Sequence, residues 1–251
     1  MSKMIDLKKK VGIVLEKRKV ANDVKAQVGV AFDITGSMRG LYNSGAVQNL
    51  AERLLAVALR FDDNGTLDSW SFCDDSDLLA PVTEKNFEKY VAEEMINNNK
   101  IQKWGSTEYA PVLKDIDMYY FGGSTYSIER ITEAATGFFG KLFGKTNTVE
   151  KKVEAKWSGE NDGKTPVYLM FVTDGENFDA DETWAVLEAL SKKNIYIEFI
   201  GIGNEKFGLC QKAADKYDNV GFVRVKDISS VSDDVLYETL LNEEFCTWIK
   251  K

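Results

Sequence analysis

Two short apolar runs that each end in an aspartate constrain the fold of this chain most strongly. Residues 28–32 (VGVAF) precede Asp33, and residues 167–173 (VYLMFVT) precede Asp174. Uninterrupted runs of this kind are typical of strands buried on both faces of a parallel sheet. We therefore expect an α/β protein with a doubly wound, mostly parallel six-stranded sheet and helices on both faces. Residues 78–83 predict one antiparallel edge strand, where the missing N–H of Pro81 is tolerated.

The order of the predicted strands brings the two aspartates together. Ligands of doubly wound sheets bind outside the carboxyl ends of the strands, at the point where the strand order reverses. Asp174 closes the fourth strand that we count along the chain. With the order 3-2-1-4-5-6, the strand ending at Asp33 and the strand ending at Asp174 are neighbours at that reversal.

Three hydroxyl side chains are expected at the same edge of the sheet. Thr35 and Ser37 follow Asp33 at alternate positions, and Thr107 precedes a predicted helix. A helix-capping role explains either Asp33 or Asp174 alone, but it does not explain hydroxyls at the same strand ends. Carboxylate and hydroxyl oxygens are hard ligands, which suit Mg²⁺, Mn²⁺ or Ca²⁺ rather than zinc or copper. The five residues together predict a site for one of these hard divalent cations.

This pattern resembles the von Willebrand factor type A (vWA) domain. Its metal-ion-dependent adhesion site (MIDAS) consists of Asp-x-Ser-x-Ser with a distant Thr and a distant Asp. The resemblance extends to the vWA domains of bacterial tellurium-resistance (Ter) proteins of the TerF-like subgroup. Two departures are Thr35, which stands where the family usually has Ser, and the long segment between Pro111 and Asp174. The resembling stretches are residues 41–48, 58–65, 107–112, 171–177, 199–203 and 234–241.

The resemblance implies how the ion is held and what it does. Ser37, Thr35 and Thr107 approach the metal directly, and the two aspartates hold it directly or through water. One coordination position is left for an acidic side chain of a partner protein, and Glu108, Gly36 and Gly175 lie where that partner makes contact. Family membership also implies a role in tellurite resistance, chemical stress or phage defence, together with calcium-binding Ter proteins.

An enzyme is the alternative interpretation of the same segments. Residues 33–37 (DITGS) resemble the Asp-Lys-Thr-Gly-Thr of aspartyl-phosphate transporters and phosphatases, and residues 174–179 (DGENFD) resemble their Gly-Asp-Gly-x-Asn-Asp. Asp33 would then be the covalent nucleophile of a Mg²⁺-dependent phosphatase. Such phosphatases usually carry a second Asp two residues after the nucleophile, and that position is Thr35 here. We therefore expect a binding module and not an enzyme.

Composition excludes several other functions. The 251 residues include no histidine, which rules out a Ser-His-Asp triad and any His-ligated metal site. The net charge of −8 argues against nucleic-acid binding, which needs a cationic face. The three cysteines form no Cys-x-x-Cys pair, so we expect buried thiols in a reducing compartment. We find no signal-peptide pattern and no apolar run long enough to span a membrane, and we therefore expect a cytoplasmic protein.

Two segments lie outside the regular α/β pattern, one at the N-terminus and one within the predicted domain. Residues 1–24 predict a basic N-terminal arm folded over a vWA domain of residues 25–251, and a membrane-surface anchor is the less favoured alternative. Residues 121–165 predict an insertion, either a hairpin or helix packed on the sheet edge or a partner-contacting surface. Within it we expect a helix over residues 129–139. Further helices are expected over residues 84–97 and from about Ser230, with Ser230 as the cap.

Overall fold

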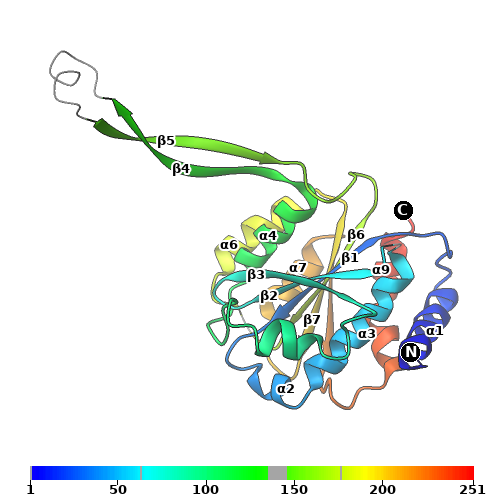
Figure 1. Cartoon of the computed structure of the whole chain (residues 1–251). Coiled ribbons are helices and arrows are strands. Elements are labelled where there is room, and N and C mark those ends of the chain that lie inside the picture. The colour runs from blue at the N-terminus through cyan, green and yellow to red at the C-terminus, as the bar shows by residue number, and fades with distance from the viewer. Residues whose placement is uncertain (1, 63, 135–145, 176) are drawn as a thin grey trace. The chain divides into compact units, whose positions relative to one another are not determined.

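The sheet of the computed structural model has the strand order β3-β2-β1-β6-β7-β8 (Figure 1). The structure describes all residues except 1, 63, 135–145 and 176. Neighbouring strands are parallel except β2 and β3, which are antiparallel. The predicted order and the antiparallel edge strand are therefore confirmed. The strands are β1 (Gln27–Asp33), β2 (Thr66–Phe72), β3 (Ser76–Thr83), β6 (Val167–Thr173), β7 (Ile195–Ile202) and β8 (Val220–Val225).

Helices cover both faces of this sheet because successive side chains of the buried strands point to opposite sides. Val30 and Phe32 of β1 join the core formed with α3 and α8, whereas Ala31 between them is buried on the other face. Figure 1 shows α4, α6 and α7 on that other face. The helices are α1 (Ser2–Lys17), α2 (Arg39–Asn43), α3 (Ala46–Phe61), α4 (Ala110–Phe121), α6 (Ala180–Leu190), α7 (Gly208–Lys216), α8 (Asp233–Leu240) and α9 (Glu243–Trp248).

The register of the two central strands sets the two predicted aspartates close together. Phe32 of β1 pairs with Val172 of β6, so both strands end at the same level. Asp33 is the last residue of β1, and Asp174 is the first residue after β6. Because the two strands are parallel neighbours, both aspartates lie at the carboxyl edge of the sheet.

The N-terminal segment is a helix, α1, which packs against α3 and α8. Its apolar face is buried, with Leu7, Val11 and Leu15 at most 2% exposed. Lysines flank this face, and Lys3, Lys10 and Lys17 form ion pairs with Glu52 of α3 and with Asp233 and Glu238 of α8. The apolar side chains of this segment are therefore part of the main core.

A second compact unit comprises residues 117–160. It contains β4 (Gly123–Ala134) and β5 (Thr146–Trp157), which pair antiparallel from Gly123–Trp157 to Ala134–Thr146. The predicted helix over residues 129–139 is wrong for 129–134, which belong to β4, and residues 135–139 lie outside the described residues. Glu and Arg favour a helix locally, but strand pairing along the whole ribbon overrides that preference.

Two other local predictions need correction. In place of a helix over residues 84–97, the structure has turns followed by a short π-helix, η1 (Val91–Ile96). The last part of the chain is two helices rather than one, and α8 is capped by Ser232, whose Oγ accepts a hydrogen bond from Val235 N. Ser230 instead donates to Asp227. Among the described residues, we find no helix with the length and apolar character needed to cross a membrane.

Candidate metal centre

Asp33 is completely buried at the end of β1, and hydrogen bonds fix both of its carboxylate oxygens. Oδ1 accepts from the backbone N and the hydroxyl of Thr35, at 2.8 Å and 2.5 Å. Oδ2 accepts from Thr173 Oγ1 at 2.7 Å. Burial raises the pKa of Asp33 to about 6, even though these three hydrogen bonds lower it. The carboxylate is thus held in one orientation and kept away from water.

The hydroxyls of Thr35 and Ser37 link the two aspartates. Ser37 Oγ donates to Asp174 Oδ1 at 2.8 Å, and the Thr35 and Ser37 oxygens are 3.1 Å apart. Each hydroxyl has a single proton. The two protons serve three contacts, one to each aspartate and one between the hydroxyls, so one contact lacks a proton when both aspartates are ionised. A cation at this place would relieve the resulting repulsion between oxygen lone pairs.

Thr107 supplies the third hydroxyl, from the loop that precedes α4. Its side chain is only 6% exposed, and its hydroxyl makes no hydrogen bond with any described residue. Thr107 Oγ1 lies 3.7 Å from the position that a Cβ on Gly175 would take, so it is next to the residue that follows Asp174. The carbonyl of Thr107 accepts from Phe178 N at 2.8 Å. The loop after β6 and the loop before α4 are thereby joined beside Asp174.

The loop that carries Thr107 is held against the end of β1. Trp104 N donates to Ile34 O at 2.8 Å, and Arg39 lies over the Trp104 ring, 4.7 Å from its centroid. Trp104 has a left-handed backbone, with φ of 68°. The next residue, Gly105, lies against the carboxylate of Asp74, which would have to move if a Cβ were added there.

Sequence reasoning missed three residues that support the site. Thr173 binds Asp33, as described above. Tyr109 OH donates to Gly175 O at 2.7 Å, and its other contact is Thr173 Oγ1 at 3.2 Å. Asp179 accepts from Tyr109 N at 3.0 Å and from Ala110 N at 2.7 Å, so a carboxylate from another segment caps α4. Thr173 and Tyr109 lie within two residues of a predicted ligand, and Asp179 lies five residues after Asp174, but nothing in the pattern indicated their contacts.

The three residues expected to contact a partner lie around the same centre. Gly36 is exposed, and its N–H lies 3.5 Å from the carbonyl of Gly105. Glu108 is partly exposed, and its N–H donates to Cys73 O at 3.0 Å. Gly175 is partly exposed beside Thr107. The five predicted ligands and these three residues thus come from three separate segments that meet at one edge of the sheet.

The donor set consists of oxygen atoms only. The centre offers two carboxylates and three hydroxyls, and it holds no sulfur or imidazole ligand. Among the described residues, no group of three or more His, Cys, Asp or Glu side chains is placed to hold a metal ion. Asp174 is partly exposed, and burial together with the charge of Glu205 raises its pKa, whereas the Ser37 hydrogen bond lowers it. Such a set fits a hard divalent cation with few anionic ligands.

The fold defines a vWA-type α/β domain. The chain belongs to the family of vWA domains found in the C terminus of TerF, because that family model matches residues 25–129 and 128–251. A relative from Bacillus subtilis (strain 168), the uncharacterized protein YcbR, is 36% identical over 252 residues. The match covers 98% of this chain and 87% of the relative.

Solved structures support the same fold at low sequence identity. Two crystal structures of proximal thread matrix protein 1 from the mussel byssus superpose with TM-scores of 0.58 and 0.55, each at 16% identity. Both matches cover 89% of this chain, which spans about half the length of those chains, 49% and 48%.

Proposed function

We propose that this protein is a divalent-metal-dependent binding module, which recognises an acidic side chain of a partner protein through a MIDAS-type metal. Mg²⁺ is the favoured ion, with Mn²⁺ and Ca²⁺ as alternatives. The observation that carries the proposal is the convergence of Asp33, Thr35, Ser37, Thr107 and Asp174 at the ends of β1 and β6. The ion would supply an electrophilic point for a carboxylate.

The state of the predicted ligands supports this proposal. Asp33 is already oriented by Thr35 and Thr173, and the hydroxyl of Thr107, which has no hydrogen-bond partner among the described residues, is available to a ligand. Three of the five donors are neutral. A divalent cation held by two carboxylates keeps an attraction for a third, so an acidic partner is the expected ligand.

The proposal includes the absence of catalysis. A phosphatase would need Asp33 as its nucleophile, but both oxygens of this buried carboxylate accept hydrogen bonds. Because Asp33 is 0% exposed, a phosphorus atom could reach either oxygen only after the surrounding residues had moved. This arrangement favours a structural and metal-holding role for Asp33, and we propose no reaction for the site.

The cellular role follows from the family alone and is part of the proposal. We propose that the protein works in a tellurite or chemical-stress resistance system, or in phage defence, with calcium-binding Ter proteins as partners. A cytoplasmic location agrees with the three cysteines, Cys73, Cys210 and Cys246, which are free and buried.

Calorimetry with Mg²⁺, Mn²⁺ and Ca²⁺ tests the metal site directly. We expect one site, and we expect Asp174→Asn to weaken it by about tenfold or more, because a neutral amide replaces an anionic ligand. Asp181→Asn, on the exposed first turn of α6, is the matched control and should bind as the unaltered protein does. Equal affinity of Asp174→Asn and the control would refute the assignment.

The open coordination position needs its own measurement. With Mn²⁺ as the bound ion, the enhancement of water-proton relaxation reports water on the metal. We expect N-acetyl-aspartate amide to lower the enhancement by replacing that water, and N-acetyl-asparagine amide, which lacks the charge, to leave it unchanged. An equal effect of both compounds would show that the ion does not select a carboxylate.

A further inference from the structure

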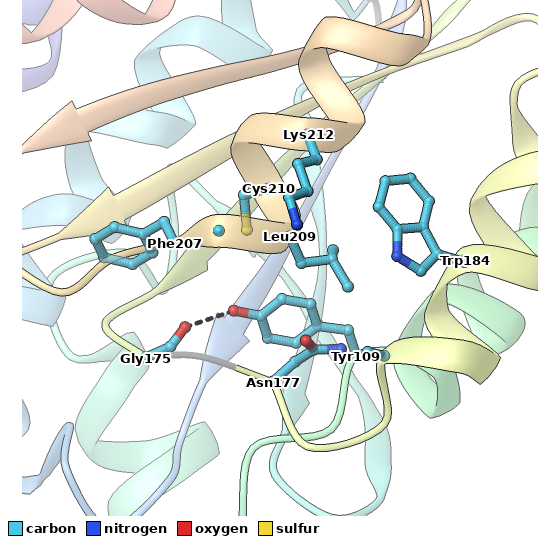
Figure 2. Close-up of a pocket in the computed structure, with 10 residues that line it drawn as sticks. Tyr109, Gly175, Asn177, Trp184, Phe207, Leu209, Cys210 and Lys212 are labelled. Carbon is cyan, nitrogen blue, oxygen red and sulfur yellow. Dashed lines mark hydrogen bonds between the residues drawn. The ribbon is translucent and has the colours of Figure 1, made fainter.

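A pocket of about 270 Å³ lies beside the candidate metal centre (Figure 2). It is formed by the loop after β6, the beginning of α6 and the beginning of α7. Gly175 and Asn177 line it on the loop side, and Trp184 lines it from α6. Ligand pockets for drug-sized molecules usually measure about 300 to 1,000 Å³. Because its volume is just below this range, the pocket suits one large side chain better than a nucleotide or a similar cofactor.

The pocket exposes polar and apolar atoms in about equal measure. Its apolar lining includes the rings of Tyr109 and Trp184 and the side chain of Leu209, which surround it in Figure 2. Phe207 also lines it and is only 1% exposed. A large apolar side chain that enters these walls leaves water and contacts several rings, which is how aromatic anchors contribute most of the affinity at protein interfaces.

Two polar groups of this pocket can fix the orientation of a bound side chain. The Nδ2 of Asn177 donates to Asp179 Oδ1 and to Thr183 Oγ1, which uses both of its hydrogens and leaves Oδ1 as an acceptor. Lys212 is exposed at the rim, and its amine makes no ion pair or hydrogen bond with any residue that the structure describes. Among the described lining residues it is the one charged side chain. The pocket thus offers an acceptor on one side and a free cation at its mouth.

The pocket is continuous with the surface around the metal centre. Gly175 lines it and directly follows Asp174, and Tyr109 holds Gly175 through the hydrogen bond from its hydroxyl to the Gly175 carbonyl. Phe178, which follows the lining residue Asn177 and whose N–H donates to Thr107 O, is 77% exposed. A partner residue next to a metal-bound carboxylate is therefore within reach of the pocket.

Charge distinguishes the two sides of Asp174. A second crevice, of about 230 Å³, contains Asp174 itself together with Glu205, Lys226 and Asp227. Its two further carboxylates repel an acidic segment, whereas the pocket on the other side presents Lys212. An acidic partner is therefore directed toward the Lys212 side.

We propose that this pocket binds an aromatic side chain of the partner, located within two residues of the carboxylate that binds the metal. A Trp or Tyr fits best, because its N–H or O–H can donate to Asn177 Oδ1. A second acidic residue of the partner pairs with Lys212. The proposal rests on the proposed metal-dependent function and defines the partner as an acidic segment with an aromatic residue.

A displayed library of heptapeptides with a fixed central Asp and random flanking residues tests the proposal. The library is selected against the whole chain of 251 residues in two separate experiments, one with Mg²⁺ and one with EDTA, which removes the ion. We expect enrichment of Trp or Tyr within two positions of the Asp, together with a second Asp or Glu, in Mg²⁺ alone. Enriched peptides should bind about tenfold or more weakly to Leu209→Trp, which fills the pocket, with unchanged metal affinity by calorimetry.

Charge reversal at matched positions tests the side of approach. Lys212→Glu should reduce the affinity of the same peptides by about fivefold or more, and Lys226→Glu, on the other side of Asp174, should not. The pocket proposal would be overturned, and the metal function left intact, if the metal-dependent peptides showed no enrichment of aromatic residues or bound Leu209→Trp as tightly as the unaltered protein.

Two other results would also overturn the pocket proposal. One is that the aromatic peptides bind equally well in EDTA, and the other is that a chain that binds Mg²⁺ enriches no peptide at all. Absence of metal binding in calorimetry would refute the proposed function itself.

Discussion

Glu198 is a buried carboxylate with no ion-pair partner among the described residues, and it makes the stability of this fold depend on pH. It lies in the middle of β7 and is 0% exposed. Oε2 accepts one hydrogen bond, from Asn242 Nδ2 at 3.0 Å, and Oε1 has no partner among the described residues. Burial raises the pKa of Glu198 well above its ordinary value, the Asn242 hydrogen bond lowers it, and the charge of Glu244 raises it further.

The direction of the effect follows from proton linkage. Below about pH 4.5, Glu198 is protonated in both the folded and the unfolded chain, and its titration does not change stability. Above that pH the unfolded chain releases the proton, while the folded chain keeps it until the pH reaches the raised pKa. Each pH unit in this window lowers the free energy of unfolding by up to about 1.4 kcal/mol.

Glu198→Gln removes this titration while keeping the shape of the side chain and an oxygen for Asn242. We expect the variant to gain stability over the unaltered protein as the pH rises. From pH 4.5 to pH 6.5, the difference in unfolding free energy should grow by up to about 2.7 kcal/mol. Glu84→Gln, at an exposed turn, is the matched control and should show a constant difference.

Urea unfolding followed by circular dichroism at several pH values between 4 and 8, in EDTA, measures the difference. Asp33 titrates in both proteins, so its contribution cancels when the two are compared at each pH. A difference between Glu198→Gln and the unaltered protein that stays flat across this range would refute the reasoning. It would mean that the carboxylate is solvated or paired in the folded protein.

Three further predictions concern the candidate metal centre. Thr107→Ala should weaken Mg²⁺ binding in calorimetry but leave the urea midpoint in EDTA unchanged, because the hydroxyl has no partner among the described residues. Asp179→Ala should lower the unfolding free energy by about 1 to 2 kcal/mol, since the N–H groups of Tyr109 and Ala110 lose their acceptor, and Asp179→Asn should recover part of the loss in the same urea experiment. p-Nitrophenyl phosphate with Mg²⁺ should not be hydrolysed, and turnover that disappears in Asp33→Asn would favour a phosphatase.

The architecture could be predicted from the sequence because buried parallel strands leave a simple signal. The apolar runs before Asp33 and Asp174 marked the two central strands, and the rule that ligands bind at the reversal of strand order placed their ends together. The supporting hydrogen bonds could not be predicted in this way. Asp179 caps α4 across 69 positions of sequence, and such a contact depends on loop conformations that no periodic pattern encodes.

Local errors had similar physical causes. Residues 129–134 contain good helix formers, but each pairs with a residue of β5 that lies up to 22 positions along the chain, from Glu129–Lys151 to Ala134–Thr146. A short window of sequence cannot reveal pairing between residues that lie this far apart in the chain. The cap of α8 is Ser232 instead of Ser230. Ser230 has an acidic residue, Asp233, three positions later, whereas Ser232 has Val235 there, so the capping-box pattern favoured the wrong serine.

The two ends of the unit of residues 117–160 lie next to each other in space. Glu160 N donates to Tyr119 O at 2.7 Å, and Gly123 pairs with Trp157 immediately beyond. Because its two ends already meet, the length of chain between them adds only slowly to the entropy of closing the loop. This position can therefore accept shorter or longer segments during evolution, and it offers an experimenter a place to exchange the ribbon for a reporter domain.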